Sequence, residues 1–410
     1  MMKEVNIMNT FIATMANLPS RHPRRLALVL AQIGLFVTVL SFGISIAGMN
    51  IGIFACLVGC VCAGAPLHRL GAVWAYLAYV ALLYVSLGYH GMPDNGIAVS
   101  SIPLGLIVAQ VAFHPDLPGA AVLRRWIMMA LVVSVSAAAL LALAQYTIGK
   151  GGDAPFRLDP AGKRYALSTG FFSIHLTQGA VMGLLFVLVS AIATGWWRTV
   201  GQVASAVCVG ICGARGAVLG FAAAVAAMVA ARGGRFVFIG AGIAVVIIFT
   251  AIGLMRLTQP ERLDNSLAMR DGRWPIWQTS LQMIADQPFL GTGGSKNFKE
   301  TYLRAYPQVV KDIPNEFPRG APHAHNTQLS LSAEYGIPFA LAWLIMLFVP
   351  LSHLYRGNPE IFRAGLGIVV MVLVFGQFEK LDGAASRVLW TSLGMLLSLR
   401  HQPSASPTIS

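Results

Sequence analysis

The chain has 410 residues, of which 56% are hydrophobic and only 11% are charged. A soluble protein would carry roughly 25% charged residues, so these few charges could not cover the surface of a water-soluble globule. The apolar residues form long continuous runs separated by short basic stretches. This pattern predicts a chain that crosses a membrane many times, and it excludes disorder and disfavours a β-barrel.

The formal net charge of +13 indicates membrane topology before it indicates an anionic partner. The basic residues stand at the ends of apolar runs, where Lys and Arg keep the adjoining short loops in the cytoplasm. We therefore expect no nucleic acid among the partners, and a site for a smaller anion stays open.

The predicted fold is an all-α polytopic membrane protein with about twelve transmembrane helices and one large polar loop that contains short helices. A tail at 1–25 precedes a first apolar stretch that is too long for a cleaved signal peptide, so this stretch is predicted to be a retained anchor. Spans 1–9 are predicted within 26–255 and spans 10–12 within 328–399, with the polar loop at 256–327 and a short tail at 400–410. The approximate spans are 26–49, 50–65, 70–89, 96–113, 126–147, 165–194, 199–213, 216–231, 236–255, 328–352, 364–378 and 384–399.

Basic residues in the short loops set the predicted orientation. With the N-terminus inside, Arg69, Arg124, Arg198 and Arg356 fall in cytoplasmic connections. An even number of spans returns the C-terminus to the same side, so both termini are predicted to be cytoplasmic. The opposite, outer side then receives the segments 88–95, 148–164, 256–327 and 379–386.

The first candidate site residue is Arg215, which lies between two apolar spans and is flanked by small residues. An arginine at that depth is costly unless it snorkels, pairs or binds a ligand. A topology signal would be cytoplasmic, yet the span count places Arg215 outside, which favours an anion-binding role over a snorkelling residue. Lys163 and Arg164 precede another span on the same side, where ordinary interface charges are favoured over contacts to a phosphate.

The second candidate lies in the long loop, where Arg270 and Arg273 stand beside Trp274 and Trp277. Arginine suits bidentate contact with phosphate, and a Trp ring can stack on a sugar or anchor at the lipid headgroups. The spacing of the apolar residues predicts an amphipathic helix near the membrane surface. The run Pro288–Gly294 that follows is predicted to be a turn, because no strand precedes it as in a phosphate-binding loop.

The third candidate is the pair His323 and His325 with the adjacent Asn326. A histidine can take a hydroxyl proton near neutral pH, and the asparagine could orient the ring or a substrate. His-x-His can also bind zinc, but no nearby carboxylate or cysteine of familiar spacing completes a ligand set. We favour a general base over a structural loop histidine, and both of these over a metal site.

Two acidic residues in the last outer loop are weaker candidates. Glu379 and Asp382 could orient the histidine or bind a sugar. A local salt bridge near Lys380, or a solvated turn, is the favoured interpretation.

The chain has no Walker motif, no dinucleotide fingerprint and no Asp-x-Asp pair. We therefore expect no cofactor and no metal, and the energy for a reaction has to arrive with the substrate. On the outer side of a membrane, a lipid-linked pyrophosphate would supply a good leaving group.

Three motifs make the chain resemble the O-antigen ligase and polymerase superfamily, and most closely its ligases. They are Arg215 after small residues, Arg273-Trp-Pro-Ile-Trp277 followed by Gln287-Pro-Phe-Leu-Gly-Thr-Gly293, and His325-Asn326 ahead of Gly336-Ile-Pro338. The motifs cover roughly the second half of the chain, and the first half resembles the family only in its hydropathy. The resemblance implies a multi-pass protein of a bacterial inner membrane with one large periplasmic loop and an active site that faces the periplasm.

The resemblance also implies roles for individual residues. Arg215 and Arg273 would contact the pyrophosphate of an undecaprenyl-linked O-antigen, and His325 would activate a sugar hydroxyl of the lipid A-core acceptor. The implied reaction is a metal-independent glycosyl transfer with inversion at the anomeric carbon. Further contacts to substrate are expected from Arg270, which could share or replace the role of Arg273, and from Trp274, Trp277, His323, Asn326, Lys163 and Arg164.

Other functions stay open. An O-antigen or exopolysaccharide polymerase uses the same donor, but the one Arg-x10-Gly spacing typical of polymerases, Arg356 to Gly367, falls on the predicted cytoplasmic side. A protein O-oligosaccharyltransferase of the same superfamily fits as well. A lipid or solute transporter is the alternative from another class, but its ionisable residues would lie near the middle of several spans, whereas these charges cluster at span ends.

Overall fold

The computed structural model of the chain describes residues 23–65, 67, 70–92, 94–148, 168–172, 174–258, 273–309, 321, 323–381 and 383–400. Within these ranges the regular elements are helices, which confirms the predicted all-α class. The first part of the chain forms α2 (Pro23–Leu40), α3 (Ile46–Cys62), α4 (Gly71–Tyr89), α5 (Gly96–Ser101), α6 (Leu104–Ala112) and α7 (Ala120–Ile148). The second part forms α8 (His175–Ile192), α9 (Gly195–Ile211), α10 (Arg215–Ala230), α11 (Phe236–Thr258), α13 (Arg273–Asp286), α14 (Ser295–Val309), α15 (Thr327–Tyr335), α16 (Ile337–Tyr355), α17 (Pro359–Phe375) and α18 (Gly383–Leu399).

Five of the described helices are long and apolar enough to cross a membrane, namely Pro23–Leu40, Gly71–Tyr89, Ala120–Thr147, His175–Ile192 and Ile337–Tyr355. Shorter apolar helices pack beside them, among them Ile46–Cys62, Arg215–Ala230 and Phe236–Thr250. Helices suit a membrane because they satisfy their own backbone polar groups. The protein is therefore a helical membrane protein, and the total of about twelve spans stays a prediction.

Close helix packing in the bundle depends on glycine, as between α2 and α3. A Cβ atom added at Gly34 would lie 2.4 Å from the backbone nitrogen of Cys56, and one at Gly59 would lie 2.4 Å from that of Ala31. A side chain at either position would therefore clash, and glycine lets the two helix backbones pack closely, which is how helices associate where lipid removes the usual hydrophobic driving force.

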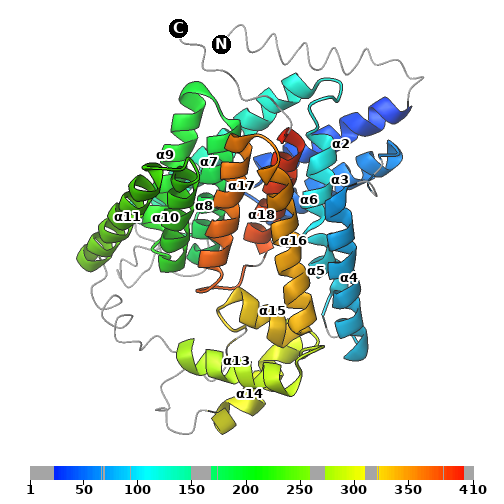
Figure 1. Cartoon of the computed structure of the whole chain (residues 1–410), viewed down its shortest axis with the longest axis vertical. Coiled ribbons are helices and arrows are strands. Elements are labelled where there is room, and N and C mark those ends of the chain that lie inside the picture. Colours follow the sequence, from blue (N-terminus) through cyan, green and yellow to red (C-terminus); the bar gives the residue numbers. More distant parts are fainter. Residues whose placement is uncertain are drawn as a thin grey trace.

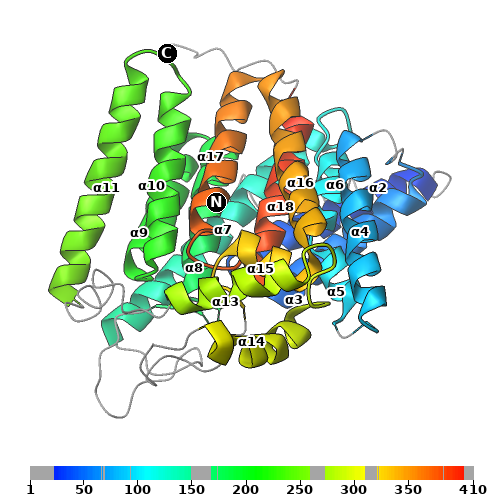
Figure 2. The same cartoon turned by 60° about the horizontal axis from the view of Figure 1, so that its bottom comes forward.

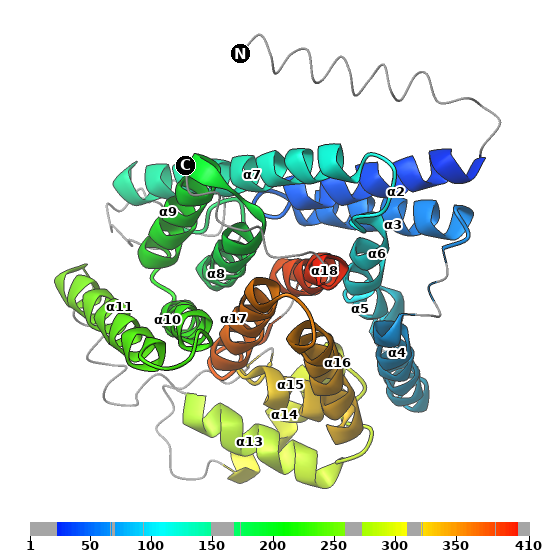
Figure 3. The ribbon, with the colours of Figure 1, turned by 45° about the horizontal axis from the view of Figure 1, so that its top comes forward.

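Helix α18 occupies the centre of the bundle, where α6, α8, α16 and α17 surround it (Figure 3). Its residues from Ala384 to Leu399 are all buried. Trp390 packs edge-on against Trp343 of α16, with ring centroids 6.0 Å apart. Because this central helix begins at Gly383, it holds the short loop before it, 376–381, in a fixed place at one end of the bundle.

Helices α13, α14 and α15 lie across that same end of the bundle, which we call the loop end (Figures 1 and 2). They share a small core of their own, formed by Ile276, Met283, Phe298, Tyr302, Ala321, Ala324 and Ala333. The predicted helix near Trp274 is present as α13, but its buried face carries Ile276 and Met283. The predicted apolar residues of this helix divide between two faces, because Trp274 and Leu281 are 60% and 53% exposed whereas Ile284 packs against the small core.

The predicted span 328–352 is wrong at its start, because two helices replace it. The break is Gly336, which has φ = 94°. A Cβ atom there would lie 2.1 Å from the carbonyl oxygen of Phe289, so only glycine fits both the left-handed backbone and the close approach. Helix α15 ends before this residue, and α16 starts after it with a proline in its first turn.

The predicted spans 96–113 and 165–194 also differ from the structure. The first is divided into α5 and α6, with Pro103 at the start of α6. In the second, α8 begins only at His175. Residues 168–172 are not helical, because the buried Gln145 side chain accepts hydrogen bonds from the backbone of Thr169 and Gly170, each at 2.9 Å. His175 is therefore the first residue of the candidate span His175–Ile192.

Candidate active site

Two loops that are distant in sequence meet at the loop end through Thr327, the first residue of α15. Its backbone N–H donates to the carbonyl of Gly376 at 2.7 Å, and its hydroxyl donates to the carbonyl of Glu379 at 2.9 Å. The same hydroxyl oxygen accepts from the N–H of Leu381 at 2.9 Å. These bonds fix the segment 323–327 to the loop 376–381, so the side chains of both segments are held against each other.

The backbone conformation of His325 and the cap formed by Asn326 place these residues beside the loop 376–381. His325 has φ = 49°, a left-handed conformation that costs a non-glycine residue about 1–3 kcal/mol and is characteristic of functional sites. Asn326 caps α15, because its Oδ1 accepts from the N–H of Leu329 at 3.0 Å, and its Nδ2 donates to Oε1 of Gln377 at 3.2 Å. Asn326 is therefore a helix cap, and the substrate contact expected from the sequence stays a prediction.

Both histidines share one carboxylate, that of Glu379. Nε2 of His323 lies 2.7 Å from Oε1 of Glu379, and Nδ1 of His325 lies 3.1 Å from each of the two carboxylate oxygens. The side chains of His323 and His325 are 21% and 29% exposed, and that of Glu379 only 8%. The prediction that Glu379 forms a local salt bridge with Lys380 is wrong, since Glu379 orients the two imidazoles.

The charge on Glu379 decides which ring nitrogen carries the proton. Burial acts to raise the pKa of Glu379, but the hydrogen bonds and charges of His323 and His325 outweigh burial and lower that pKa to about 2. An ionised carboxylate can only accept hydrogen bonds. Nδ1 of His325 therefore carries hydrogen, and in the neutral ring Nε2 holds the free lone pair. This is the tautomer that a general base needs.

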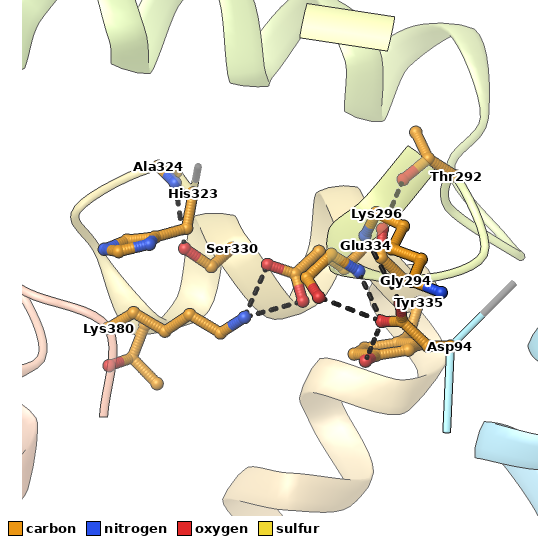
Figure 4. A network of polar contacts seen from close by, with 12 residues as sticks. Asp94, Thr292, Gly294, Lys296, His323, Ala324, Ser330, Glu334, Tyr335 and Lys380 are labelled. Carbon is orange, nitrogen blue, oxygen red and sulfur yellow. Dashed lines mark hydrogen bonds and ion pairs between the residues drawn. The ribbon is translucent and has the colours of Figure 1, made fainter. Parts of the chain in front are cut away.

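Lys380 pairs with another buried acid, Glu334 of α15. Its Nζ lies 2.6 Å and 2.7 Å from the two carboxylate oxygens, and the Glu334 side chain is fully buried (Figure 4). Burial raises the pKa of Glu334, and the charge of Lys380 opposes that rise. The pair fastens the loop that carries Glu379 to the helix that follows His325.

Replacing Glu334 with alanine is expected to destabilise the protein by about 3–5 kcal/mol, because the ammonium group of Lys380, whose side chain is only 14% exposed, would lose its partner. Thermal unfolding of the purified protein in detergent measures the effect. The double variant Glu334→Leu with Lys380→Met should recover most of the loss, since apolar residues of similar size replace a buried ion pair without penalty. A double variant as unstable as the single one would contradict this account.

Hydrogen bonds to the backbone of Glu334 hold the glycine run 291–294, and the side chain of Asp94, in the loop after α4, holds the start of α14. The N–H groups of Gly293 and Gly294 donate to the carbonyl of Glu334 at 2.8 Å and 2.9 Å. Oδ2 of Asp94 accepts from the N–H of Ser295 at 2.6 Å and from the hydroxyl of Tyr335 at 3.3 Å. Figure 4 shows Lys380 and Asp94 reaching this region from opposite sides. The predicted turn is confirmed, and its amides bind the end of α15.

Arg215 and Arg273 both begin helices that reach the loop end. A Cβ atom on Gly216 would lie 2.8 Å from Cβ of Phe378, so the start of α10 packs against the residue before Glu379. Arg273 opens α13, which packs against α15. The two predicted arginines thus lie on elements that adjoin the His325 loop.

The remaining predicted site residues divide into two groups. Trp274 is exposed on α13, and Trp277 is partly buried on the same helix. Lys163, Arg164, Arg270 and Asp382 lie outside the described residues. The sequence analysis ranked Glu379 too low and did not pair Lys380 with Glu334, although the charged residues Glu379 and Lys380 in the last outer loop were the available signal.

Comparison with known proteins adds an independent finding. Residues 200–344 match a family model, Wzy_C, described as O-antigen ligase. A search of curated proteins found no match. The matched range contains Arg215, Arg273, His323 and His325, in the order predicted from the three motifs. The match over this stretch supports an O-antigen ligase superfamily assignment.

Proposed function

We propose that the protein is an O-antigen ligase of a bacterial inner membrane. It would transfer O-antigen polysaccharide from undecaprenyl pyrophosphate to a sugar hydroxyl of lipid A-core at the periplasmic face, by a metal-independent inverting mechanism. The observation that supports this most is the contact between His325 Nδ1 and the ionised Glu379. His325 lies in the stretch 200–344 that matches the O-antigen ligase family model. A histidine held in this tautomer suits the deprotonation of a hydroxyl.

The proposed reaction is a single displacement. Nε2 of His325 removes the proton of the acceptor hydroxyl, and the hydroxyl oxygen attacks the anomeric carbon of the donor. The bond from that carbon to the pyrophosphate oxygen breaks, and undecaprenyl pyrophosphate leaves with the electron pair. Attack opposite to the leaving group inverts the anomeric configuration. Arg215 and Arg273 stabilise the charge that develops on the pyrophosphate.

Glu379 is a positioning residue in this proposal. Replacing it with glutamine is expected to lower the transfer rate about ten- to hundredfold, the usual effect of losing the group that orients a functional histidine. Glu379→Asp keeps the negative charge that holds the imidazole and should restore part of the rate. An aspartate variant as slow as the glutamine variant, with the thermal stability of the wild type, would contradict the positioning role.

Purified full-length protein, mixed in detergent with undecaprenyl-pyrophosphate-linked O-antigen and lipid A-core in the presence of EDTA, tests the function. A ladder of glycosylated lipid A-core is the expected product, together with free undecaprenyl pyrophosphate. Longer glycans on the undecaprenyl carrier would instead indicate a polymerase, and a glycosylated acceptor protein would indicate a protein O-oligosaccharyltransferase. Donor lipid that stays chemically unchanged would contradict an enzyme and favour a transporter.

A further inference from the structure

Three groups at the loop end could also bind a metal ion. One ligand atom from each of His323, His325 and Glu379 lies within 4.8 Å of the other two. The ring nitrogens in contact with the carboxylate are Nε2 of His323 and Nδ1 of His325. We propose that these atoms form a tridentate site for a transition-metal dication such as Zn²⁺, and that an ion bound there inhibits the enzyme. The inhibitory part rests on the proposed function, whereas the binding part does not.

The donor set and its spacing fit zinc. Two imidazoles and one carboxylate with an open fourth position form a common zinc ligand set. With bonds of about 2.0–2.1 Å and tetrahedral angles, ligand atoms lie about 3.4 Å apart. Here each imidazole nitrogen lies 2.7 Å or 3.1 Å from Oε1 of Glu379. These distances are shorter than that spacing by about 0.7 Å or less, so the carboxylate and the rings need to separate only slightly to admit the ion.

The surroundings of the site also favour a cation. Glu379 places a carboxylate, the anionic ligand of the set, between the two ring nitrogens. The neighbouring ammonium of Lys380 is neutralised by Glu334 at 2.6 Å. Both histidine side chains are partly exposed, so an ion can enter from solvent. The cap at Asn326 and the bonds of Thr327 hold the two loops in place, and a preorganised backbone lowers the cost of binding.

The sequence alone disfavoured a metal here, because only two ligands were visible. The third ligand, Glu379, lies 54 residues after His325. Thr327 brings it into place. The site is therefore a consequence of the contact between the two loops and has no local sequence signature.

A metal at this site would remove the base. A neutral imidazole that coordinates through Nδ1 carries its hydrogen on Nε2. Binding of the ion would thus transfer the proton of His325 from Nδ1 to Nε2 through solvent, and the lone pair that accepts the hydroxyl proton would be lost. The ion also takes the Glu379 carboxylate away from the ring. Both changes oppose transfer, so the ion acts as an inhibitor.

Direct binding is the first test. Full-length protein in detergent, freed of metal with EDTA and then exchanged into chelator-free buffer, is titrated with Co²⁺, whose visible absorption reports tetrahedral ligands, and then with Zn²⁺. We expect one site per chain in the wild type. We expect affinity about tenfold weaker or more in His323→Ala and in Glu379→Gln, since each loses a ligand.

His114→Ala is the matched control. His114 lies 3.7 Å from the carboxylate of Asp116 in another loop, so it is a second histidine with an acidic neighbour. Its replacement should leave the affinity unchanged. Equal metal affinity in the wild type, His323→Ala and Glu379→Gln would overturn the site.

Inhibition is measured as the second test, with each variant compared with its own metal-free rate. Micromolar Zn²⁺ should stop transfer by the wild type, and EDTA should restore it. His323→Ala should need about tenfold more Zn²⁺ or more for the same fractional inhibition. Full activity of the zinc-loaded wild type would overturn the inhibitory role. Binding without transfer under any condition would contradict the proposed function and leave the metal site intact.

Discussion

Replacing His325 with alanine is expected to lower the rate of glycosyl transfer by about 10²–10⁴-fold, the range that a general base contributes. In the proposed mechanism Nε2 of His325 accepts the hydroxyl proton, and its lone pair is available because Nδ1 donates to Glu379 at 3.1 Å. The rate is measured with the purified protein, the lipid-linked donor and lipid A-core.

His325→Gln separates the loss of a base from the loss of packing. Its amide can still donate a hydrogen bond to Glu379, but it cannot accept a proton at neutral pH. We therefore expect the same loss of rate with normal thermal stability. A glutamine variant that transfers at nearly the rate of the wild type would rule out His325 as the base.

The variants Arg215→Ala and Arg273→Ala are each expected to lower the transfer rate on the order of a hundredfold or more. Each would lose a preorganised positive group that stabilises the negative charge developing on the pyrophosphate. Lysine keeps the charge but not the planar pair of donors, so it should rescue only in part. The initial rate at saturating donor distinguishes loss of transition-state stabilisation from weaker binding.

Arg304→Ala is the control for these variants. Arg304 lies on α14 at the same end of the bundle, and its side chain is 81% exposed beside Glu300. Its removal should leave the rate within about twofold of the wild type, as expected for an exposed charge. If Arg273→Ala retained full transfer, the assigned phosphate contact would be wrong.

The fold class and the central candidates could be predicted from the sequence because their signals are local. Long apolar runs specify helices, and Arg215, Arg273 and His325 each stand in a short motif. Glu379 could not be recognised in the same way, since it acts through a contact between loops 54 residues apart. Hydropathy carries no information about which loops touch.

The break at Gly336 shows a different limit. The apolar run continues through it, so a hydropathy pattern predicts one span, but the chain needs a left-handed residue there to turn past Phe289. Gly336 followed closely by Pro338 was the local sign of a new helix start. The helix boundary thus depends on backbone geometry that the count of apolar residues does not record.

The loop end is also fastened to the first half of the chain. Asp94 accepts from the start of α14, and the hydroxyl of Ser86 donates to the carbonyl of Leu290 at 2.6 Å. Neither residue lies within the matched stretch 200–344, and neither do Glu379 and Lys380. A chimera that receives only this stretch would lose its anchors on both sides. Grafting the loop that carries His325 into another scaffold therefore requires three transplanted pieces, namely the matched stretch and the segments around 86–94 and 376–381.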